Sequence, residues 1–391
     1  MSTILNKRVQ GLKPSLLWKF FDLANETPDV ISLSVGEPDF PTPWHVREEG
    51  IYAIEKGRTY YPPTRGLLQL RKGIAAYYRR RFGIDGYTLD QVLVTVGGSE
   101  ALDLALRVTL SQGDEVIVLD PGYVAYEPLV QMAGGVPVYL SLKEEDGFKV
   151  TPENLRPLIT DKTKMIILNY PSNPTGGVMT AMDYAAIVPL LQHHYIVALC
   201  DEIYLELTYD APGCSLARFR KELGEQLIIV NGFSKAWSMT GWRLGFALAE
   251  KEIITAMNAV HQYSAMGPAT PAQFAAIEAV HARCDQDIEE HVLAFKGRRN
   301  YLVNRLNQMG LRTAMPAGAF YVFANITATG LDSVTFATRL LKEAHVCCIP
   351  GNAFGPSGEG FVRISYAYSL ERLKEACMHI EKFMKQFTEE K

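Results

Sequence analysis

One lysine in the sequence has neighbours suited to nucleophilic chemistry. Lys235 comes shortly after the apolar residues 227–230, with Ser234 beside it and Arg243 further along the same segment. A lysine at the carboxyl end of a buried strand lies where open α/β sheets bind ligands, and burial there lets its amine attack an aldehyde. The serine hydroxyl and a bidentate arginine are suitable partners for a dianionic phosphate. A lone loop lysine is usually a solvated cation, but the glycines spaced around Lys235 favour the functional interpretation.

A second segment has the residues of an anion-binding turn. The strand expected at residues 92–96 ends in Gly97 and Gly98, and we expect Ser99 to cap the helix that follows. Free backbone N–H groups, a hydroxyl and the positive end of a helix would converge there on a phosphate. Many α/β turns that bind nothing have the same residues, so this segment alone leaves both interpretations open.

The residues around Lys235 also match a signature. The pattern small-x-small-Lys…Gly-x-Arg-x-Gly is matched by Gly232, Ser234, Lys235, Gly241, Arg243 and Gly245. With these residues the sequence resembles the class I aminotransferases of PLP fold type I, and the likeness extends from residues 34–39 to residues 362–366. The resemblance implies pyridoxal 5′-phosphate (PLP) as cofactor, carried by Lys235 as a Schiff base. It also implies ping-pong transfer of an amino group from an L-amino acid to a 2-oxo acid such as 2-oxoglutarate.

The resemblance implies roles for other residues that touch the cofactor. The expected catalytic residues are Lys235, Asp201 and Tyr204; Asp201 would keep the pyridine nitrogen protonated, and Tyr204 would hydrogen-bond the ring oxygen. Tyr123 would stack on the ring, although many core aromatic residues look the same. Taken alone, Asp201 would be a helix cap. The whole expected cofactor-binding set is Gly98, Ser99, Glu100, Tyr123, Asn173, Asp201, Tyr204, Ser234, Lys235, Arg243 and Tyr61.

Three residues are expected to bind the substrate. Arg363 matches the arginine that grips the α-carboxylate by a bidentate pair, and Asn173 the asparagine of the Asn-Pro-x-Gly turn. Gly36 matches the glycine whose backbone approaches the substrate. The plain alternatives are a solvated arginine, a tight surface turn and a turn glycine. Arg363 lies between Val362 and Ile364 in an alternating strand, so it must point to a face of its own.

The segment from Tyr60 to Gly66 predicts how subunits associate. It matches the stretch in which a tyrosine of one subunit reaches the phosphate in the other subunit's site, and we assign Tyr61 by counting back from Gly66. A homodimer with shared sites follows, and the apolar residues 12–21 would need a surface to bury against. Tyr61 could instead be a core tyrosine, and for Arg65 a plain surface charge is favoured over a substrate contact.

Departures from the family pattern leave open which amino acid donates the amino group. Gly232 replaces a hydroxyl residue of some relatives, and Ser99 replaces a basic residue of some acidic-substrate relatives. No arginine can be assigned to bind the distal, side-chain carboxylate of an acidic substrate. Aromatic or neutral amino acids are therefore favoured as amino donors at least as much as aspartate. Two alternative functions share the cofactor: a Cys-Sβ lyase, which would release pyruvate and ammonia from cystathionine, and a PLP-sensing regulatory domain, which would need an attached DNA-binding module.

The elements that would position these residues alternate between strands and helices. Strands are expected at residues 92–96, 115–119, 165–168, 196–200, 227–230 and 244–248, with helices such as 99–110 and 180–193 between them. This pattern is typical of a largely parallel α/β sheet flanked by helices, and the resemblance implies the seven-stranded type.

A smaller α+β domain is expected after about Pro271. Long helices appear there, with strands at residues 320–326, 346–349 and 362–366 and a final helix through 387, and residues 31–35 could pack with them. We therefore predict an N-terminal arm and part of the small domain at 1–45, a large PLP-binding domain at 46–285 and a small C-terminal domain at 286–391.

Composition excludes several classes of protein. At 391 residues the chain suggests two lobes, and a net charge of −4 gives no general attraction to nucleic acid or anionic lipid. The six cysteines lack metal-ligand spacing and read as reduced core residues, so we expect a cytoplasmic protein without a metal site. Neither a signal peptide nor a membrane-spanning run is legible.

Overall fold

The central sheet of the molecule has seven strands and places the ligand-binding edge. A computed structural model describes residues 4, 6–12 and 14–387. The strand order is β2 (Val92–Thr95), β8 (Gly245–Ala249), β7 (Leu227–Gly232), β6 (Val197–Asp201), β5 (Thr163–Asn169), β3 (Glu115–Asp120) and β4 (Val136–Ser141). β8 runs antiparallel to both neighbours, and the other pairs are parallel. The predicted strands are confirmed, and β4 is an additional edge strand.

Apolar residues cover both faces of this sheet. In β6, Ala198 and Cys200 pack into one core with α4 (Leu68–Phe82) and α8 (Ala181–His193). Val197 and Leu199 point to the other face, where α5 (Gly97–Thr109) and α10 (Lys251–Ser264) cover them. A strand buried on both faces is apolar without alternation, which is why β6 reads as a continuous hydrophobic run.

The small lobe is built around a three-stranded antiparallel sheet. Its order is β11 (Ile349–Pro350), β12 (Phe361–Ser365) and β9 (Tyr321–Asn325), and Arg363 lies in the central strand. β1 (Ile31–Ser32) pairs in parallel with β10 (Val346–Cys347), so the early segment joins the late lobe as expected. Residues 346–349 divide between two sheets, whereas one strand was expected.

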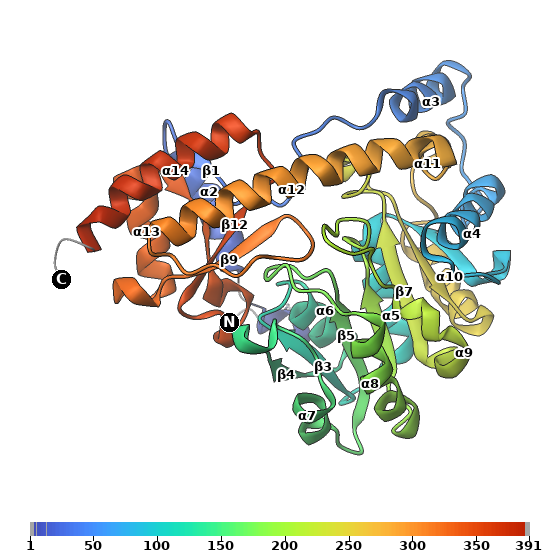
Figure 1. Cartoon of the computed structure of the whole chain (residues 1–391). Helices are drawn as coiled ribbons and strands as arrows, with labels where there is room; N and C mark the ends of the chain where they lie inside the picture. The colour runs from blue at the N-terminus through green and yellow to red at the C-terminus, as the bar shows by residue number, and fades with distance from the viewer. Residues whose placement is uncertain (1–3, 5, 13, 388–391) are drawn as a thin grey trace.

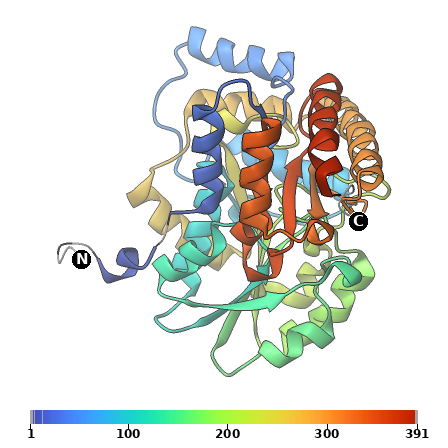
Figure 2. The same cartoon turned by 90° about the vertical axis from the view of Figure 1, so that its left-hand side faces the viewer.

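Helices complete both lobes (Figure 1). α12 (Asp285–Gln308) is the longest and runs from the large lobe to α13 (Ser333–Ala344) and α14 (Leu370–Met384). α2 (Leu16–Glu26) packs on the small lobe (Figure 2). The remaining helices are α1 (Lys7–Gln10), α3 (Trp44–Glu55), α6 (Tyr126–Ala133), α7 (Pro152–Leu155), α9 (Arg220–Leu223) and α11 (Thr270–Ala279). No helix in the described ranges has the length and apolar character needed to cross a bilayer.

Candidate active site

A cavity of about 260 Å³ opens where strands of the large sheet end and the small lobe begins. Asn169 ends β5, Asp201 ends β6 and Gly232 ends β7, so their carboxyl ends share one edge of the sheet. Such an edge is the usual ligand site of an open α/β sheet. Of the predicted site residues, the cavity is lined by Gly36, Gly98, Ser99, Tyr123, Asn173, Asp201, Tyr204, Ser234, Lys235, Arg243 and Arg363.

Lys235 presents its amine to this cavity. Nζ donates a hydrogen bond of 2.6 Å to the carbonyl oxygen of Gly36. Burial lowers the pKa of Lys235 to about 8, with Arg363 and Arg243 acting in the same direction and Glu37 opposing them. About a tenth of the amine is therefore neutral at pH 7, far more than for an ordinary lysine, and the neutral form is the one that acts as nucleophile or proton acceptor.

Gly36 is a glycine because of the tyrosine that packs against it. A Cβ atom at this position would clash with the hydroxyl of Tyr321. That hydroxyl lies 2.8 Å from the hydroxyl of Tyr204, which is 4% exposed. The main chain of Gly36 and the two tyrosines thus form one wall beside Lys235.

Asp201 lies at the end of β6 and is buried. Its carboxylate accepts hydrogen bonds from the hydroxyl of Tyr126 at 2.9 Å and from the backbone N–H of Ile203 at 3.2 Å. Burial raises the pKa of Asp201 to about 6, although both hydrogen bonds lower it. A buried carboxylate of this kind is stabilised by a cationic partner, and a protonated ring nitrogen would be one.

Arg363 is a buried cation whose hydrogen bonds go to neutral oxygens. Its guanidinium donates to Oδ1 of Asn173 at 2.9 Å and to the carbonyl oxygen of Ser34 at 2.5 Å. The side chain is 2% exposed, and its Nε has no hydrogen-bond partner within the described part of the chain. A buried, incompletely satisfied guanidinium suits an anion, and its fork matches a carboxylate.

Asn173 is held in place by a second asparagine that sequence reasoning missed. The backbone N–H of Asn173 donates to Oδ1 of Asn169 at 3.0 Å, and Nδ2 of Asn169 donates to the carbonyl oxygen of Asp201. Asn169 therefore ties the ends of β5 and β6 together. Its position at a strand end was the signal available in the sequence.

A cationic corner forms at the start of α5. Gly98 and Ser99 lie in the first helical turn, and Ser234 and Arg243 face the same cavity. Gly97 has a φ of 73°, and a Cβ there would lie 2.7 Å from a guanidinium nitrogen of Arg243. The glycine thus lets the arginine approach the helix N-terminus, and the combination is suited to a phosphate dianion.

The predicted cap of α5 is wrong. Ser99 is inside the helix, and the N-cap residue is Val96. No side chain of a described residue caps the first turn of α5, and the carboxylate of Glu100 instead accepts from the backbone N–H of Val96 at 2.6 Å and contacts Nδ1 of His261 at 2.8 Å. These contacts direct the Glu100 side chain away from the cavity, and Glu100 is not among the lining residues.

Tyr61 also lies outside the cavity. Its side chain is 85% exposed in the single chain. Arg65, in the same segment, pairs with Asp90 at 3.1 Å and donates to Thr255, which agrees with the favoured interpretation as a surface charge.

Sequence reasoning missed most of the apolar and aromatic lining. Tyr126 supports Asp201 from α6, and Tyr321 contributes from β9 of the small lobe. Leu17, Trp18 and Phe21 of α2 line the cavity although they lie early in the chain. Nothing in the spacing of these residues pairs them with Lys235.

The side chains present fit PLP. The cationic corner suits its phosphate, Asp201 its ring nitrogen, and Lys235 its aldehyde carbon, while Asn173 and Tyr204 supply polar groups for its ring oxygen. Arg363 is left to bind a second anion.

Comparisons with known proteins agree with this reading. The family model "Aminotransferase class I and II" matches residues 28–380. The chain is 40% identical to aromatic-amino-acid aminotransferase 2 of Thermococcus litoralis, over 98% of both chains. It is also 40% identical to the aspartate aminotransferase of Pyrococcus abyssi, over 98% of both. The structure of the Thermus thermophilus aspartate aminotransferase with maleate superposes with a TM-score of 0.92 at 38% identity, covering 97% of this chain and 100% of that one.

Proposed function

This chain belongs to the class I and II aminotransferases, PLP-dependent enzymes that transfer amino groups, and we propose that it prefers aromatic or neutral L-amino acids as donors. The observation that carries the proposal is the small number of cationic side chains in the cavity, each of which already has a task. Within the part of the chain that the structure describes, the cations lining the cavity are Lys235, Arg243 and Arg363. Lys235 is assigned to the cofactor aldehyde, Arg243 to the phosphate and Arg363 to the α-carboxylate, so among the described residues of the single chain the distal carboxylate of an acidic donor has no dedicated cation.

Apolar residues supply the surface that such a side chain would contact. Leu17, Trp18 and Phe21 lie on one side of α2 and line the cavity. Transfer of a large apolar side chain from water to such a wall is worth about 1.5–3 kcal/mol when complete. The wall is also suited to the apolar part of a 2-oxo acid acceptor.

Each polar residue has a proposed task in amino transfer. When bound, PLP supplies an aldehyde that links to an amino group and a ring that withdraws electrons from the substrate Cα. Arg363 and Asn173 bind the α-carboxylate and fix which Cα bond is presented. The neutral amine of Lys235 accepts the Cα proton, and Asp201 holds positive charge at the ring nitrogen.

Half-reactions with single amino acids test the donor class. The purified enzyme is mixed with phenylalanine, tyrosine, leucine, aspartate or glutamate, and the loss of cofactor absorbance gives kcat/KM for each. We expect the apolar donors to react fastest and to yield their 2-oxo acids. Faster reaction of the acidic donors would overturn the preference, and pyruvate and ammonia from cystathionine without an acceptor would identify a lyase.

A matched pair of tryptophan variants tests the apolar wall. Trp18→Ala should lower kcat/KM for phenylalanine roughly tenfold relative to alanine as donor, because about 1.4 kcal/mol of contact is lost. Trp44, on α3, is similarly exposed but does not line the cavity, so Trp44→Ala should leave the ratio unchanged. Equal effects of both substitutions would show that α2 does not contact the side chain of the donor.

We also propose a homodimer with shared sites. Apolar side chains are exposed along α3 and the segment after it, namely Trp44, Ile51, Tyr52, Ile54, Tyr60, Tyr61 and Leu68. Exposed apolar side chains in this number are suited to burial in a two-fold interface. Tyr61 would then reach the phosphate corner of the partner subunit.

A further inference from the structure

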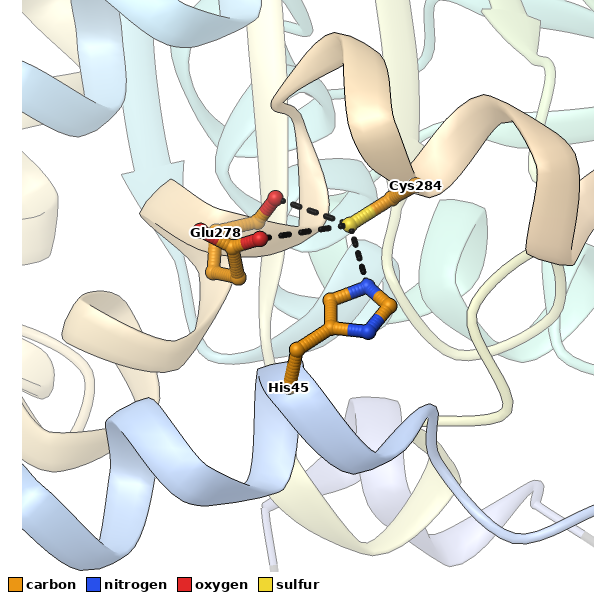
Figure 3. A group of neighbouring side chains, drawn as sticks. All are labelled: His45, Glu278 and Cys284. Carbon is orange, nitrogen blue, oxygen red and sulfur yellow. Dashed lines mark hydrogen bonds between the residues drawn. The ribbon is translucent and has the colours of Figure 1, made fainter.

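A second group of polar side chains lies apart from the cavity, where α3, α11 and the start of α12 meet (Figure 3). Nε2 of His45 lies 3.0 Å from Sγ of Cys284, and Sγ lies 3.9 Å from Oε1 of Glu278. Asp287, in the first turn of α12, adds a carboxylate oxygen 3.2 Å from the same Nε2. A nitrogen, a sulfur and a carboxylate oxygen, from His45, Cys284 and Glu278, therefore lie within 4.8 Å of one another, and Asp287 approaches this group beside His45.

We propose that His45, Glu278, Cys284 and Asp287 bind a divalent transition-metal ion, with Zn²⁺ the preferred ion. Imidazole, thiolate and carboxylate are the ligands that zinc takes in proteins. An ion 2.0–2.3 Å from four tetrahedral donors separates neighbouring donors by roughly 3.3–3.7 Å. The separations of 3.0, 3.2 and 3.9 Å lie within a few tenths of an ångström of that range. His45, Glu278 and Cys284 already lie close enough to share an ion, and the Asp287 carboxylate would have to turn toward them to supply the fourth ligand.

The electrostatics of the cluster favour a cation. The charged groups near the sulfur of Cys284 are mostly carboxylates, those of Glu278, Asp285 and Asp287, and Arg283 is the opposing cation. Such surroundings favour a cation, and a metal ion bound to the sulfur would displace the thiol proton. Arg283 contacts Oε1 of Glu278, but its side chain is 58% exposed and free to turn into solvent.

The site has an entry path and a structural consequence. Cys284 is fully buried, whereas the side chains of His45 and Asp287 are each 29% exposed, so an ion can arrive from their side. His45 lies in α3, just after the segment that contains Gly36, and Asp287 lies in the helix that runs to the small lobe. A bound ion would fasten these elements together without touching the cofactor cavity.

This proposal replaces the expectation that the cysteines bind no metal. His45 and Cys284 are 239 positions apart, so no ligand spacing is visible along the chain. The alternative is a hydrogen-bonded core cluster, in which the thiol donates to the carbonyl oxygen of Glu278 at 3.0 Å. Metal binding separates the two interpretations.

The test uses the full-length enzyme with its cofactor, dialysed against chelator and then loaded with Zn²⁺ or Co²⁺ alone. After gel filtration, elemental analysis should find one equivalent of zinc per chain. The cobalt form should show the intense visible bands of tetrahedral coordination, at longer wavelength than the cofactor. Zinc should also raise the melting temperature, because it binds the folded state.

Two ligand variants and one matched control decide the outcome. Cys284→Ser and His45→Gln should each lose the retained metal, the cobalt bands and the zinc-dependent rise in melting temperature. Cys377→Ser, at another buried cysteine, in α14, should keep all three. His45 is partly exposed, so His45→Gln remains informative if Cys284→Ser folds poorly. A wild type that retains no metal, or ligand variants that retain it like the wild type, would overturn the proposal.

Discussion

Glu202 is a buried carboxyl group whose titration should be visible in the stability of the protein. It follows Asp201 directly and is 1% exposed. Oε1 accepts hydrogen bonds from Ser215 Oγ and Leu216 N, both at 2.9 Å, and Oε2 accepts a longer one from Tyr78, so all these partners are neutral. Burial raises its pKa from 4.5 to about 8. The folded protein therefore holds a proton here that the unfolded chain releases.

The size and sign of the effect follow from this difference in pKa. Because the folded value lies above the unfolded one, the contribution to stability is complete below pH 4.5 and is lost as the pH rises toward 8. One proton changes the free energy of unfolding by about 1.4 kcal/mol per pH unit within that window. Between about pH 5.5 and 7.5 the contribution of Glu202 should thus fall by roughly 2–3 kcal/mol.

Glu202→Gln removes the proton but keeps the shape of the neutral carboxyl. Its Oε1 can still accept from Ser215 and Leu216. Equilibrium urea unfolding at fixed protein concentration, repeated across this pH range, should show the wild type losing stability relative to the variant by the amount given above. Glu375→Gln, at an exposed glutamate of α14, is the control and should follow the wild type. A constant difference between wild type and Glu202→Gln at every pH would refute the reasoning.

Three further predictions concern the proposed active site. Asp201→Asn should retain the cofactor but slow the single-turnover half-reaction by roughly 100-fold or more, because the charge opposite the ring nitrogen is lost; near-normal rates would contradict this. Arg363→Lys should raise KM for the donor about 10–100-fold, since the two-pronged contact with a carboxylate is worth 1.5–3 kcal/mol, and leave the cofactor absorbance unchanged; an unchanged KM would remove Arg363 from the substrate site. Tyr61→Phe and Lys235→Ala, each impaired alone, should regain part of the activity when their subunits are mixed; subunit exchange without recovery, or an active monomer in sedimentation, would argue against shared sites.

The large sheet was predictable because its strands are buried on both faces. Residues 165–168, 197–200 and 227–230 are continuously apolar, and each run is followed by a polar residue, Asn169, Asp201 or Asn231. Both the buried strands and their ligand-binding edge can therefore be recognised in the sequence. β4 was missed because it is an edge strand with exposed residues, Val136 among them, and a proline at 137. Local sequence therefore described the centre of the sheet better than its margin.

Residues that act through contacts across the chain were not predictable. Serine is a common helix cap, yet Ser99 lies inside the first turn of α5, and Glu100 reaches back to the backbone N–H of the N-cap residue Val96. Tyr126 and Tyr321 join the site through packing of helix on sheet and of lobe on lobe. Such contacts depend on tertiary structure, which motif spacing does not encode.

The central claim is that Lys235 carries the cofactor at the end of β7. It is tested most directly by reducing the enzyme with borohydride, digesting it and locating the phosphopyridoxyl group by mass spectrometry. We predict modification of Lys235 alone, and no fixed cofactor in Lys235→Ala. Recovery of the group on a different lysine of the unmutated protein would contradict the account.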